Sequence, residues 1–361
     1  MRLFLSDRIA SFSREVKVSR HNVSGDDSGA GPIPGPVAGP PPVAAGPHPG
    51  RWGRHRRLLL HLLLFGAALA SAIVAGAFLA GLDPLRTRFA EIGGGLYPVP
   101  TRIRFEQLTT GLTFGATFIG ILLAHELGHY LLARRHRVPV SLPYFIPFPP
   151  YFSIVGTLGA FIRLRGPMAN RSVLFDIGVA GPLVSFALSL PVLVAGLTLS
   201  EVIPALDSGT YPFRVLFLGE SVLLGNSAVL QLATWSTVPG LEPGQAILLH
   251  PLAFAGWLGI FVTALNLIPL GQLDGGHILY ALVGARQRTL GMVFVLLLIP
   301  LGLVWWGWWL WAGIALAVGR GRVGHPPVQM EEAGPGRGRM ILGWVALAIF
   351  LLSFSPAPLR L

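Results

Sequence analysis

Two histidines and a glutamate stand at a spacing suited to metal chemistry in the run His125-Glu126-Leu127-Gly128-His129. On a helix with about 3.6 residues per turn, His125 and His129 lie one turn apart on one face, so both imidazoles can ligate the same ion. Glu126 is close enough to act as a base toward a water molecule at that ion. The pattern is typical of zinc-dependent hydrolysis.

The stretch around this motif is apolar enough to lie inside a lipid bilayer. Residues 112–133 carry the large apolar side chains Phe114, Phe118, Ile121 and Leu122. With ten histidines in 361 residues, a pair at this spacing can also be structural. Ionisable side chains are costly in hydrocarbon without partners, however, and usually mark functional sites there. We therefore interpret the motif as a metal site within the membrane.

The composition of the chain is that of a polytopic membrane protein. Hydrophobic residues make up 52% and charged residues 12%, and the mean hydropathy is +0.64, which excludes an ordinary soluble domain. The net charge of +11 comes from arginines at the ends of apolar runs, so we expect a lipid bilayer and no nucleic acid as partner. Cysteine is absent, which leaves His, Asp and Glu to hold any metal.

The first part of the chain differs from the rest. Residues 1–57 hold no sustained apolar run and are rich in proline and glycine, so we expect a disordered N-terminal tail. The opening residues are interrupted too early by Asp7 and Arg8 to form a signal peptide. An organelle transit peptide is an alternative, although the tail contains acidic residues that such peptides avoid. Residues 58–361 are expected to form the membrane domain.

We expect an all-α polytopic fold with about six to seven transmembrane helices. The apolar runs cover residues 58–82, 108–134, 173–199, 246–268, 289–318 and 340–354. The fifth run is long and carries five tryptophans near its middle, which favours a hairpin of two helices with an aromatic tip at the outer interface. A single tilted helix is the alternative for this run.

Arginines indicate which ends of the helices face the cytoplasm. Arg56 and Arg57 precede the first run, Arg134 and Arg137 follow the second, and the loop of residues 200–244 is mostly acidic. By the positive-inside rule, we expect the N-terminus and the C-terminal end of the helix over residues 108–134 to face the cytoplasm. His125 comes nine residues before Arg134, which places the motif roughly 10 to 15 Å beneath that surface. We expect a bacterial cytoplasmic membrane, with the site facing the cytoplasm.

Residues 139–165 are apolar and aromatic but are broken by five prolines. They are too interrupted for a spanning helix and too apolar for a free loop. Because irregular backbone at membrane depth must be buried in protein or line a cavity, we predict a re-entrant loop or small strand pair beside the metal. An interfacial cytoplasmic loop is the alternative. A strand from Gly156 through Gly159 to Ile162 could receive an unwound substrate by edge pairing.

A second motif, Asn266-Leu-Ile-Pro-Leu-Gly-Gln-Leu-Asp-Gly-Gly-His277, follows the fourth apolar run. Its proline and glycines break the helix and present the carboxylate of Asp274 at the depth of the histidines. Since catalytic zinc typically takes three protein ligands, Asp274 is the best third ligand. It could instead cap the helix that follows. His277 and Asp176 compete for the ligand role, but Asp176 stands near Arg163 and Arg171, where charge pairing suffices.

Together the two motifs resemble the site-2 protease family of intramembrane zinc metalloproteases. Residues 156–182, the run His250 to Trp257 and His325-Pro326-Pro327 are similar to the subgroup of the chloroplast EGY proteases and their bacterial relatives. The resemblance covers residues 58–361. It implies one zinc ion per chain, held by His125, His129 and Asp274, with Glu126 as catalytic base. It also implies that Asn266 holds the substrate strand or the developing oxyanion.

The expected function is hydrolysis of peptide bonds within or near transmembrane segments of membrane-protein substrates, as in regulated intramembrane proteolysis. Gly156 and Gly159 are candidate substrate-binding residues on the proposed strand. No PDZ-like insertion separates the two motifs. A membrane metal-ion transporter and a catalytically inactive scaffold of the same fold are the rival functions. The oligomeric state is left open.

Overall fold

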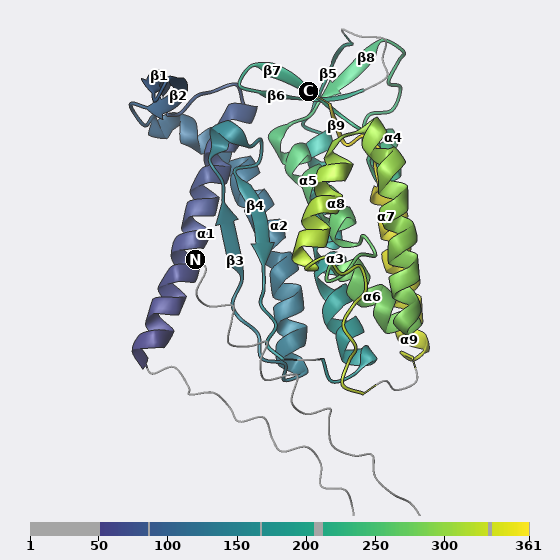
Figure 1. Ribbon diagram of the computed structural model, residues 1–361. Coiled ribbons are helices and arrows are strands. Elements are labelled where there is room, and N and C mark those ends of the chain that lie inside the picture. Colours follow the sequence, from purple (N-terminus) through teal and green to yellow (C-terminus); the bar gives the residue numbers. More distant parts are fainter. Residues whose placement is uncertain (1–50, 86, 167, 206–211, 331–333, 361) are drawn as a thin grey trace, which may run out of the picture. The chain divides into compact units, whose positions relative to one another are not determined.

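The computed structural model describes residues 51–85, 87–166, 168–205, 212–330 and 334–360 (Figure 1). All of these residues belong to one compact unit, residues 50–361. Most of the predicted tail therefore lies outside the described residues. Its last residues, 51–57, form the start of helix α1 (Arg51–Leu79), which no proline interrupts.

Four helical segments of the described chain are long and apolar enough to cross a membrane. They are residues His55–Leu79 of α1, α2 (Phe105–Arg135), α3 (Arg171–Leu197) and the segment Asp274–Val304, which joins α6 (Asp274–Val283) through a short 3-10 turn to α7 (Gln287–Val304). The apolar helices α5 (Pro251–Asn266), α8 (Gly307–Val318) and α9 (Arg337–Ser353) are shorter. The expectation of a mostly helical chain with membrane-length helices is confirmed.

Helix α2 packs against α1, α3 and α5 and lies between α1 and the remaining helices (Figure 1). Phe114 of α2 stacks on Phe118 and on Phe254 of α5, so aromatic side chains fill the core between these helices. Further toward its end, α2 carries the two motif histidines on its buried face. The helix that holds the site is thus fixed on several sides.

A pair of strands lies beside α1, where the broken apolar stretch was expected to form a re-entrant loop or strand pair. Strands β3 (Tyr144–Pro147) and β4 (Thr157–Phe161) run antiparallel. The imidazole of His61 on α1 contacts the carbonyl of Pro143 at 3.0 Å, and the hydroxyl of Ser71 donates to the carbonyl of Phe148 at 2.5 Å. The five prolines exclude a helix, and these contacts supply the backbone with partners.

The all-α expectation is wrong at the end of the molecule opposite the arginine-rich ends (Figure 1). Five strands form one sheet in the order β5-β8-β6-β7-β9. Their bounds are β5 (Glu201–Pro204), β6 (Phe213–Phe217), β7 (Glu220–Leu224), β8 (Gln245–Leu248) and β9 (Leu359–Arg360), and the short helix α4 (Ala228–Thr237) follows β7. A tight turn with positive φ at Leu218 and Gly219 joins β6 to β7, which is the geometry that two-residue hairpins favour.

Two of the predicted spans differ from a single continuous helix. The predicted span 246–268 begins as strand β8, and α5 starts only at Pro251, because proline suits the first helical position and the His250 side chain caps the helix. The predicted span 289–318 is two helices, α7 and α8, with Trp305 and Trp306 between them. Of the two forms considered for that run, the helical hairpin is the one present.

Candidate metal centre

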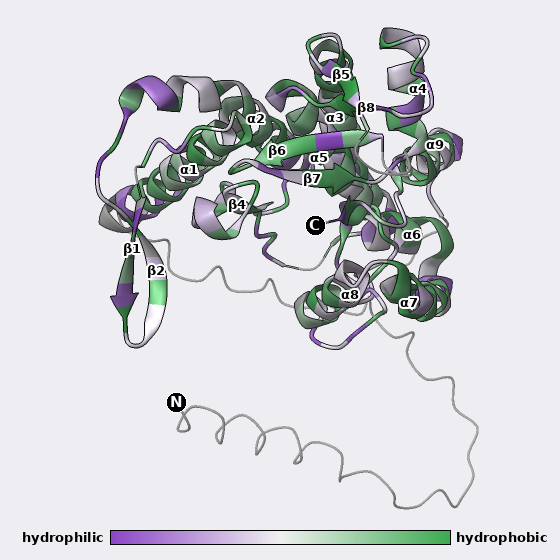
Figure 2. Cartoon of the chain, turned by 90° about the horizontal axis from the view of Figure 1, so that it is seen from above, coloured by the Kyte–Doolittle hydropathy of each residue, from purple (hydrophilic) through white to green (hydrophobic). Residues whose placement is uncertain are grey.

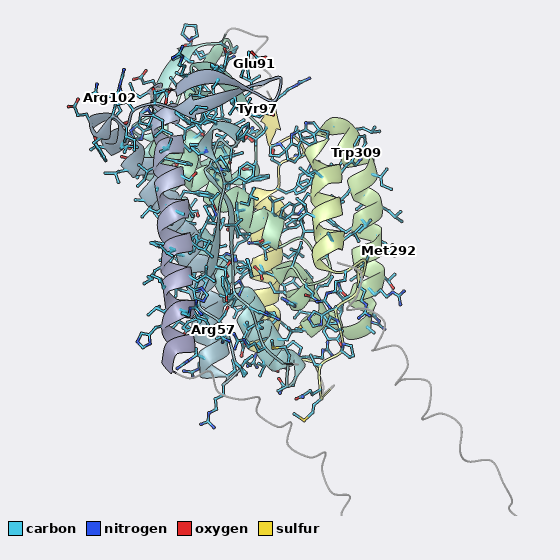
Figure 3. All side chains as sticks on the ribbon, turned by 60° about the vertical axis from the view of Figure 1, so that its left-hand side comes forward. Arg57, Glu91, Tyr97, Arg102, Met292 and Trp309 are labelled. Atoms are coloured by element: carbon cyan, nitrogen blue, oxygen red, sulfur yellow. The ribbon has the colours of Figure 1, made fainter. Side chains whose placement is uncertain are left out.

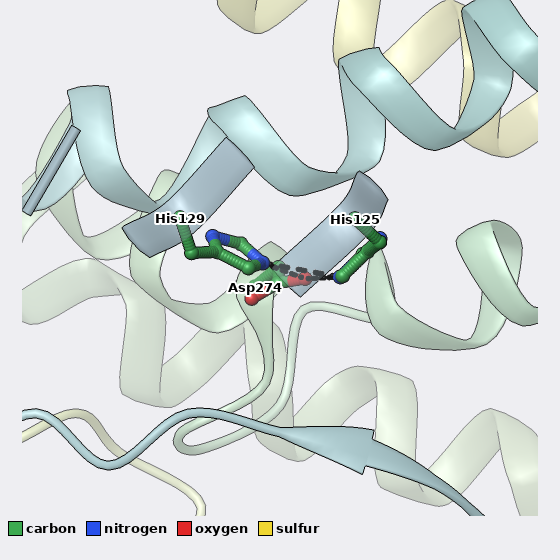
Figure 4. A group of neighbouring side chains, drawn as sticks. All are labelled: His125, His129 and Asp274. Atoms are coloured by element: carbon green, nitrogen blue, oxygen red, sulfur yellow. Dashed lines mark hydrogen bonds and ion pairs between the residues drawn. The ribbon is translucent and has the colours of Figure 1, made fainter. Parts of the chain in front are cut away.

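The two motif histidines meet Asp274 at one point inside the helix packing. His125 and His129 are buried, and their Nε2 atoms are 3.1 Å apart. Asp274 Oδ2 lies 3.2 Å from His125 Nε2 and 3.3 Å from His129 Nε2. Figure 4 shows the three side chains converging, the histidines from α2 and the aspartate from the start of α6. Among the described residues, this is the one group of three such side chains that could hold a metal ion.

The separations fit an ion of the size of zinc. Zinc bonds to histidine nitrogen and carboxylate oxygen are about 2.0–2.1 Å long, so the ligand atoms of a tetrahedral site lie about 3.3 Å apart. The three observed separations of 3.1, 3.2 and 3.3 Å match this spacing. Two imidazoles and one carboxylate are also a donor set of hydrolytic zinc sites. The residues present therefore fit the metal.

Helix α3 orients both imidazole rings. His129 Nδ1 lies 2.7 Å from the carbonyl oxygen of Ile177, which can only accept, so Nδ1 donates and Nε2 keeps its lone pair for the metal. His125 Nδ1 lies 3.0 Å from Ser185 Oγ, which lies 2.8 Å from Thr263 Oγ1 on α5. Partners of this kind fix ring orientation and raise ligand basicity.

Three further residues support the site and were not predicted from the sequence: Ser185, Ile177 and Thr263, which lie far from the motif along the chain. Ile177 contributes only a backbone carbonyl, which no side-chain pattern can reveal. Ser185 and Thr263 are hydroxyl side chains within apolar helices. That feature was the available signal for them, because polar groups at membrane depth need a partner.

Glycines let α2 and α3 approach closely at the site. A Cβ atom on Gly181 would overlap the His129 ring, and one on Gly128 would lie 2.9 Å from the Ala180 carbonyl oxygen. Only glycine leaves room for the imidazole at this crossing. The small residues Ala180 and Gly181 near the start of α3 thus allow the two helices to pack closely.

Asp274 reaches the histidines because the chain is irregular between α5 and α6. Helix α5 ends at Asn266 and α6 begins at Asp274. Between them, Pro269 cannot continue the helix and Gly271 has a φ of +49°. Leu273 occupies the N-cap position, and Asp274 is the first helical residue. The alternative role of Asp274 as N-cap is therefore wrong.

A buried glutamine on α7 holds this irregular segment. The side-chain amide of Gln287 donates to the carbonyl oxygens of Pro269 at 3.3 Å and Val323 at 3.2 Å. Its oxygen accepts from the backbone N–H of His325 at 2.9 Å. Gln287 thus ties the approach to Asp274 to the loop after α8, a role that sequence analysis did not foresee.

Glu126 is buried next to the three candidate ligands without belonging to their triangle. Its carboxylate accepts a hydrogen bond from the backbone N–H of Ile162, directly after β4. The amide nitrogen of Asn266 lies 3.3 Å from His125 Nε2. The structure therefore brings the candidate base, the candidate substrate-binding amide and the end of β4 to one place.

The two glycines proposed for substrate binding differ in their surroundings. Gly156 has a φ of +73°, and a Cβ there would lie 2.5 Å from the Ser71 carbonyl oxygen, so it seats the strand pair against α1. Gly159 lies within β4 with a φ of +106° and open space where a side chain would be. Only Gly159 stands on an accessible part of the strand.

The two competing ligands lie elsewhere. Asp176 binds Arg339 and His136 and not the nearby Arg163 or Arg171 that the sequence suggested. The reason is that α9 brings Arg339 against α3. His277 packs its ring against His325, with ring centroids 4.8 Å apart. Neither residue belongs to the group around His125.

A sequence profile of Peptidase family M50 matches residues 113–302, more than half of the chain, and this segment includes both motifs. The chain belongs to peptidase family M50. This is the site-2 protease family that the motifs resemble. The M50 match overlaps three of the four membrane-length helices, and this M50 chain is an integral membrane protein.

Curated relatives of this M50 chain include three plant proteins. The probable zinc metalloprotease EGY1 of Arabidopsis thaliana chloroplasts is 30% identical over 83% of this chain and 52% of its own length. The rice protein of the same name (Oryza sativa subsp. japonica) is 33% identical over 63% of this chain and 38% of its own length. EGY2 of Arabidopsis thaliana chloroplasts, a probable zinc metalloprotease, is 32% identical over 51% of this chain and 31% of its own length. The chain thus spans about half or less of the relatives it matches. No solved structure matches it.

Proposed function

We propose that this chain is an intramembrane zinc metalloprotease that hydrolyses peptide bonds within or near transmembrane segments of membrane-protein substrates. The observation that carries the proposal is the convergence of His125, His129 and Asp274, with Glu126 beside them, within helices of membrane length. The names of the relatives, probable zinc metalloproteases, support zinc as the metal. The site would hold about one zinc ion per chain.

When bound by the three ligands, zinc would lower the pKa of a water molecule and polarise a peptide carbonyl. Glu126 accepts the proton of that water, and the water oxygen bonds to the carbonyl carbon. As the C–N bond breaks, Glu126 returns the proton to the leaving amine. The Asn266 amide, close to His125, donates to the substrate backbone or to the oxygen on which negative charge develops.

The substrate must present extended backbone, because a helix hides its peptide bonds. Among the described residues, strand β4 pairs with β3 alone and thus along one edge, and its side chains Leu158 and Phe161 are exposed. We propose that an unwound substrate segment pairs with the other edge of β4. Gly159 lets the backbone approach closely there, and the hydrogen bond from Ile162 to Glu126 places the end of this strand at the base.

We further propose that α5, α8 and α9 lie in the same membrane as the longer helices, which gives the six to seven spans expected from sequence. Arg134 and Arg135 end α2, Arg137 follows it, and Arg286 directly precedes α7. The end of α2 lies at the lower end of Figure 1. This distribution supports a cytoplasmic-facing site in a bacterial cytoplasmic membrane. Because the chain lacks cysteine, single cysteines at positions 137 and 242 can test the orientation by labelling in sealed vesicles.

One experiment separates the protease from its two rivals. Purified chain in proteoliposomes, with a single-span membrane protein as substrate, should cleave it, lose cleavage on chelation and regain it with added zinc. A transporter would move zinc across the vesicle membrane without cleavage, and an inactive scaffold would do neither. Absence of zinc-restored cleavage across a panel of single-span substrates would contradict the proposed function.

A further inference from the structure

A hairpin of two strands joins α1 to α2. Strands β1 (Thr87–Ile92) and β2 (Gly95–Pro100) pair antiparallel over their whole length. Gly93 and Gly94 have φ values of +61° and +81° at the turn, as two-residue hairpin loops prefer. The strands make extensive contact only with each other. An isolated two-stranded hairpin is marginally stable in water.

Large apolar side chains are exposed on both of its faces, alongside the exposed charges of Arg88 and Glu91, the latter paired across the strands with Leu96. Phe89 and Leu96, on one face, are 67% and 71% exposed, while Ile92 and Tyr97, on the other, are 57% and 50% exposed. Beyond the hairpin, Phe105 at the start of α2 is 74% exposed. Such a concentration of exposed apolar side chains indicates that the hairpin is covered by something apolar.

The direction of the hairpin relative to the helices indicates that lipid covers its exposed side chains. In Figure 1 it is seen nearly end-on at the upper end of α1, whereas the view from above in Figure 2 shows its full length pointing away from the helices. Figure 3 shows the hairpin, with Glu91 and Tyr97 labelled, running across the helix axes. Because α1 and α2 are long and apolar enough to cross a membrane, the hairpin, about 20 Å long, would run along the plane of that membrane near the ends of these helices.

The hairpin lies next to exposed apolar side chains near the start of α2. Both α1 and α2 are of membrane length, and Phe105 and Leu112 of α2 are exposed. Arginines 88 and 102 are exposed on the hairpin and directly after it, where they complement lipid phosphates. Tyrosine, present at position 97, is enriched at this depth of membrane proteins.

One feature argues against another protein strand as the partner of the hairpin, and a second limits how deeply the hairpin can enter the membrane. Pro98 and Pro100 lack N–H groups, which weakens the free edge of β2 as a template for another strand. The remaining edge groups still need hydrogen-bond partners, and the hydrocarbon core offers none. Water and lipid headgroups at the interface do offer them. The hairpin therefore suits the boundary between headgroups and acyl chains.

We propose that the β1–β2 hairpin is an interfacial membrane anchor that lies in the outer leaflet, with Phe89 and Leu96 among the acyl chains and Arg88 and Arg102 on phosphates. It would fix the outer ends of α1 and α2 relative to the bilayer. Since β3 and β4 are fastened to α1, the anchor would also steady the strand pair. The anchor rests on the geometry of the hairpin and not on the proposed protease activity, while its assignment to the outer leaflet rests on the proposed orientation.

Spin labelling of the cysteine-free chain tests the anchor. The chain is reconstituted in vesicles of phosphatidylethanolamine and phosphatidylglycerol, with a spin label at Leu96→Cys or at Glu242→Cys. The measured quantity is the ratio of the label's collision rate with oxygen to its collision rate with a water-soluble nickel reagent. We expect this ratio to be several-fold higher at position 96 than at position 242. Position 242 is exposed in the loop before β8 and is expected in water. Phe89→Cys, on the same hairpin face as Leu96, should give a second reading that agrees.

Two outcomes would overturn the anchor. Equal nickel accessibility at positions 96 and 242 would mean that the hairpin stands in water. Low accessibility to both reagents at position 96 would mean that it packs against a second copy of the chain, because the vesicles contain no other protein. The double variant Arg88→Ser, Arg102→Ser provides a further arm, in which the label at position 96 should move closer to water; an unchanged depth would remove the role of the arginines.

Discussion

Two clusters of histidine and carboxylate join helices in this protein, and their partners give them opposite characters. At the metal centre, His125, His129 and Asp274 direct nitrogen and oxygen atoms at one point. At the second cluster, Asp176 faces His136 at 3.0 Å and Arg339, whose Nε and Nη2 atoms lie 2.7 and 2.8 Å from its two oxygens.

The difference lies in which atoms remain available. Arg339 occupies both carboxylate oxygens of Asp176 with a charge-assisted pair, which leaves no oxygen free for a metal. At the metal centre, protein groups occupy the Nδ1 atoms of both histidines, and both Nε2 atoms face Asp274 at the metal position. Residue types alone therefore do not specify a metal site; the second partner of each side chain does.

The largest effect is expected from removing the carboxylate of each cluster in turn. Asp274→Ala should reduce bound zinc from about one per chain to a small fraction, because one of three protein ligands is lost. Asp176→Ala should leave the zinc content unchanged. Metal analysis of the purified variants checks both. Full zinc in Asp274→Ala together with loss of zinc in His277→Ala would transfer the ligand role to His277.

The close approach of α3 to the metal centre supplies the second comparison. Gly181→Ala should weaken zinc binding roughly tenfold to a hundredfold, because overpacking typically costs about 1–3 kcal/mol and the His129 ring would have to move. Gly120→Ala, on α2 where a Cβ atom would meet open space, is the matched control and should leave zinc binding unchanged. Competition with a chelator of known affinity measures both, and equal affinities in the two variants would contradict the proposed crossing.

Removing a supporting hydroxyl should have a smaller effect than removing a ligand. Ser185→Ala leaves His125 Nδ1 without its partner, and loss of such a partner weakens metal binding about tenfold. Ser236→Ala, on the outer helix α4, serves as control. If both variants bound zinc as tightly as the unchanged chain, the orienting role of Ser185 would be wrong.

The ion pair of the second cluster should affect stability alone. Arg339→Met should lower the free energy of unfolding by about 1–2 kcal/mol, a value reduced by the partial exposure of the arginine. The side chain of Arg339 is 35% exposed. Arg337→Met, an exposed neighbour on the same helix, should have little effect. Thermal unfolding in detergent checks this, and a change of zinc content in Arg339→Met would mean that the two clusters are coupled.

The same contrast explains how much of the site the sequence could reveal. His125 and His129 were found because helix geometry alone places residues four apart on one face. Asp274 required one further step, the helix break at Pro269 and Gly271. Ile177, Ser185 and Gln287 act through contacts between helices, which local patterns do not encode. The partner of Asp176 was wrongly predicted for this reason, since Arg339 is 163 residues away.

The fold, too, has parts that local sequence patterns predict and parts that they do not. Long apolar runs predicted the membrane-length helices, because hydropathy and length are local properties. The five-stranded sheet was missed, since it brings β9 from residues Leu359–Arg360 beside β7 and pairs β6 in parallel with β8. Its strands are short, and their pairing depends on long-range contacts. Proline spacing, a local signal, predicted the strand pair β3–β4 as one of two forms.

The central claim is that Glu126 acts as a base beside a metal held by three other residues. Glu126→Gln keeps the size of the side chain but cannot accept a proton, so zinc should stay at about one per chain while cleavage falls by about two or more orders of magnitude. Glu106→Gln, at the exposed start of the same helix, should leave both unchanged. Zinc content and cleavage of a single-span substrate, measured on the same preparations, test this directly. Cleavage by Glu126→Gln at the rate of the unchanged chain, with zinc retained, would contradict the account.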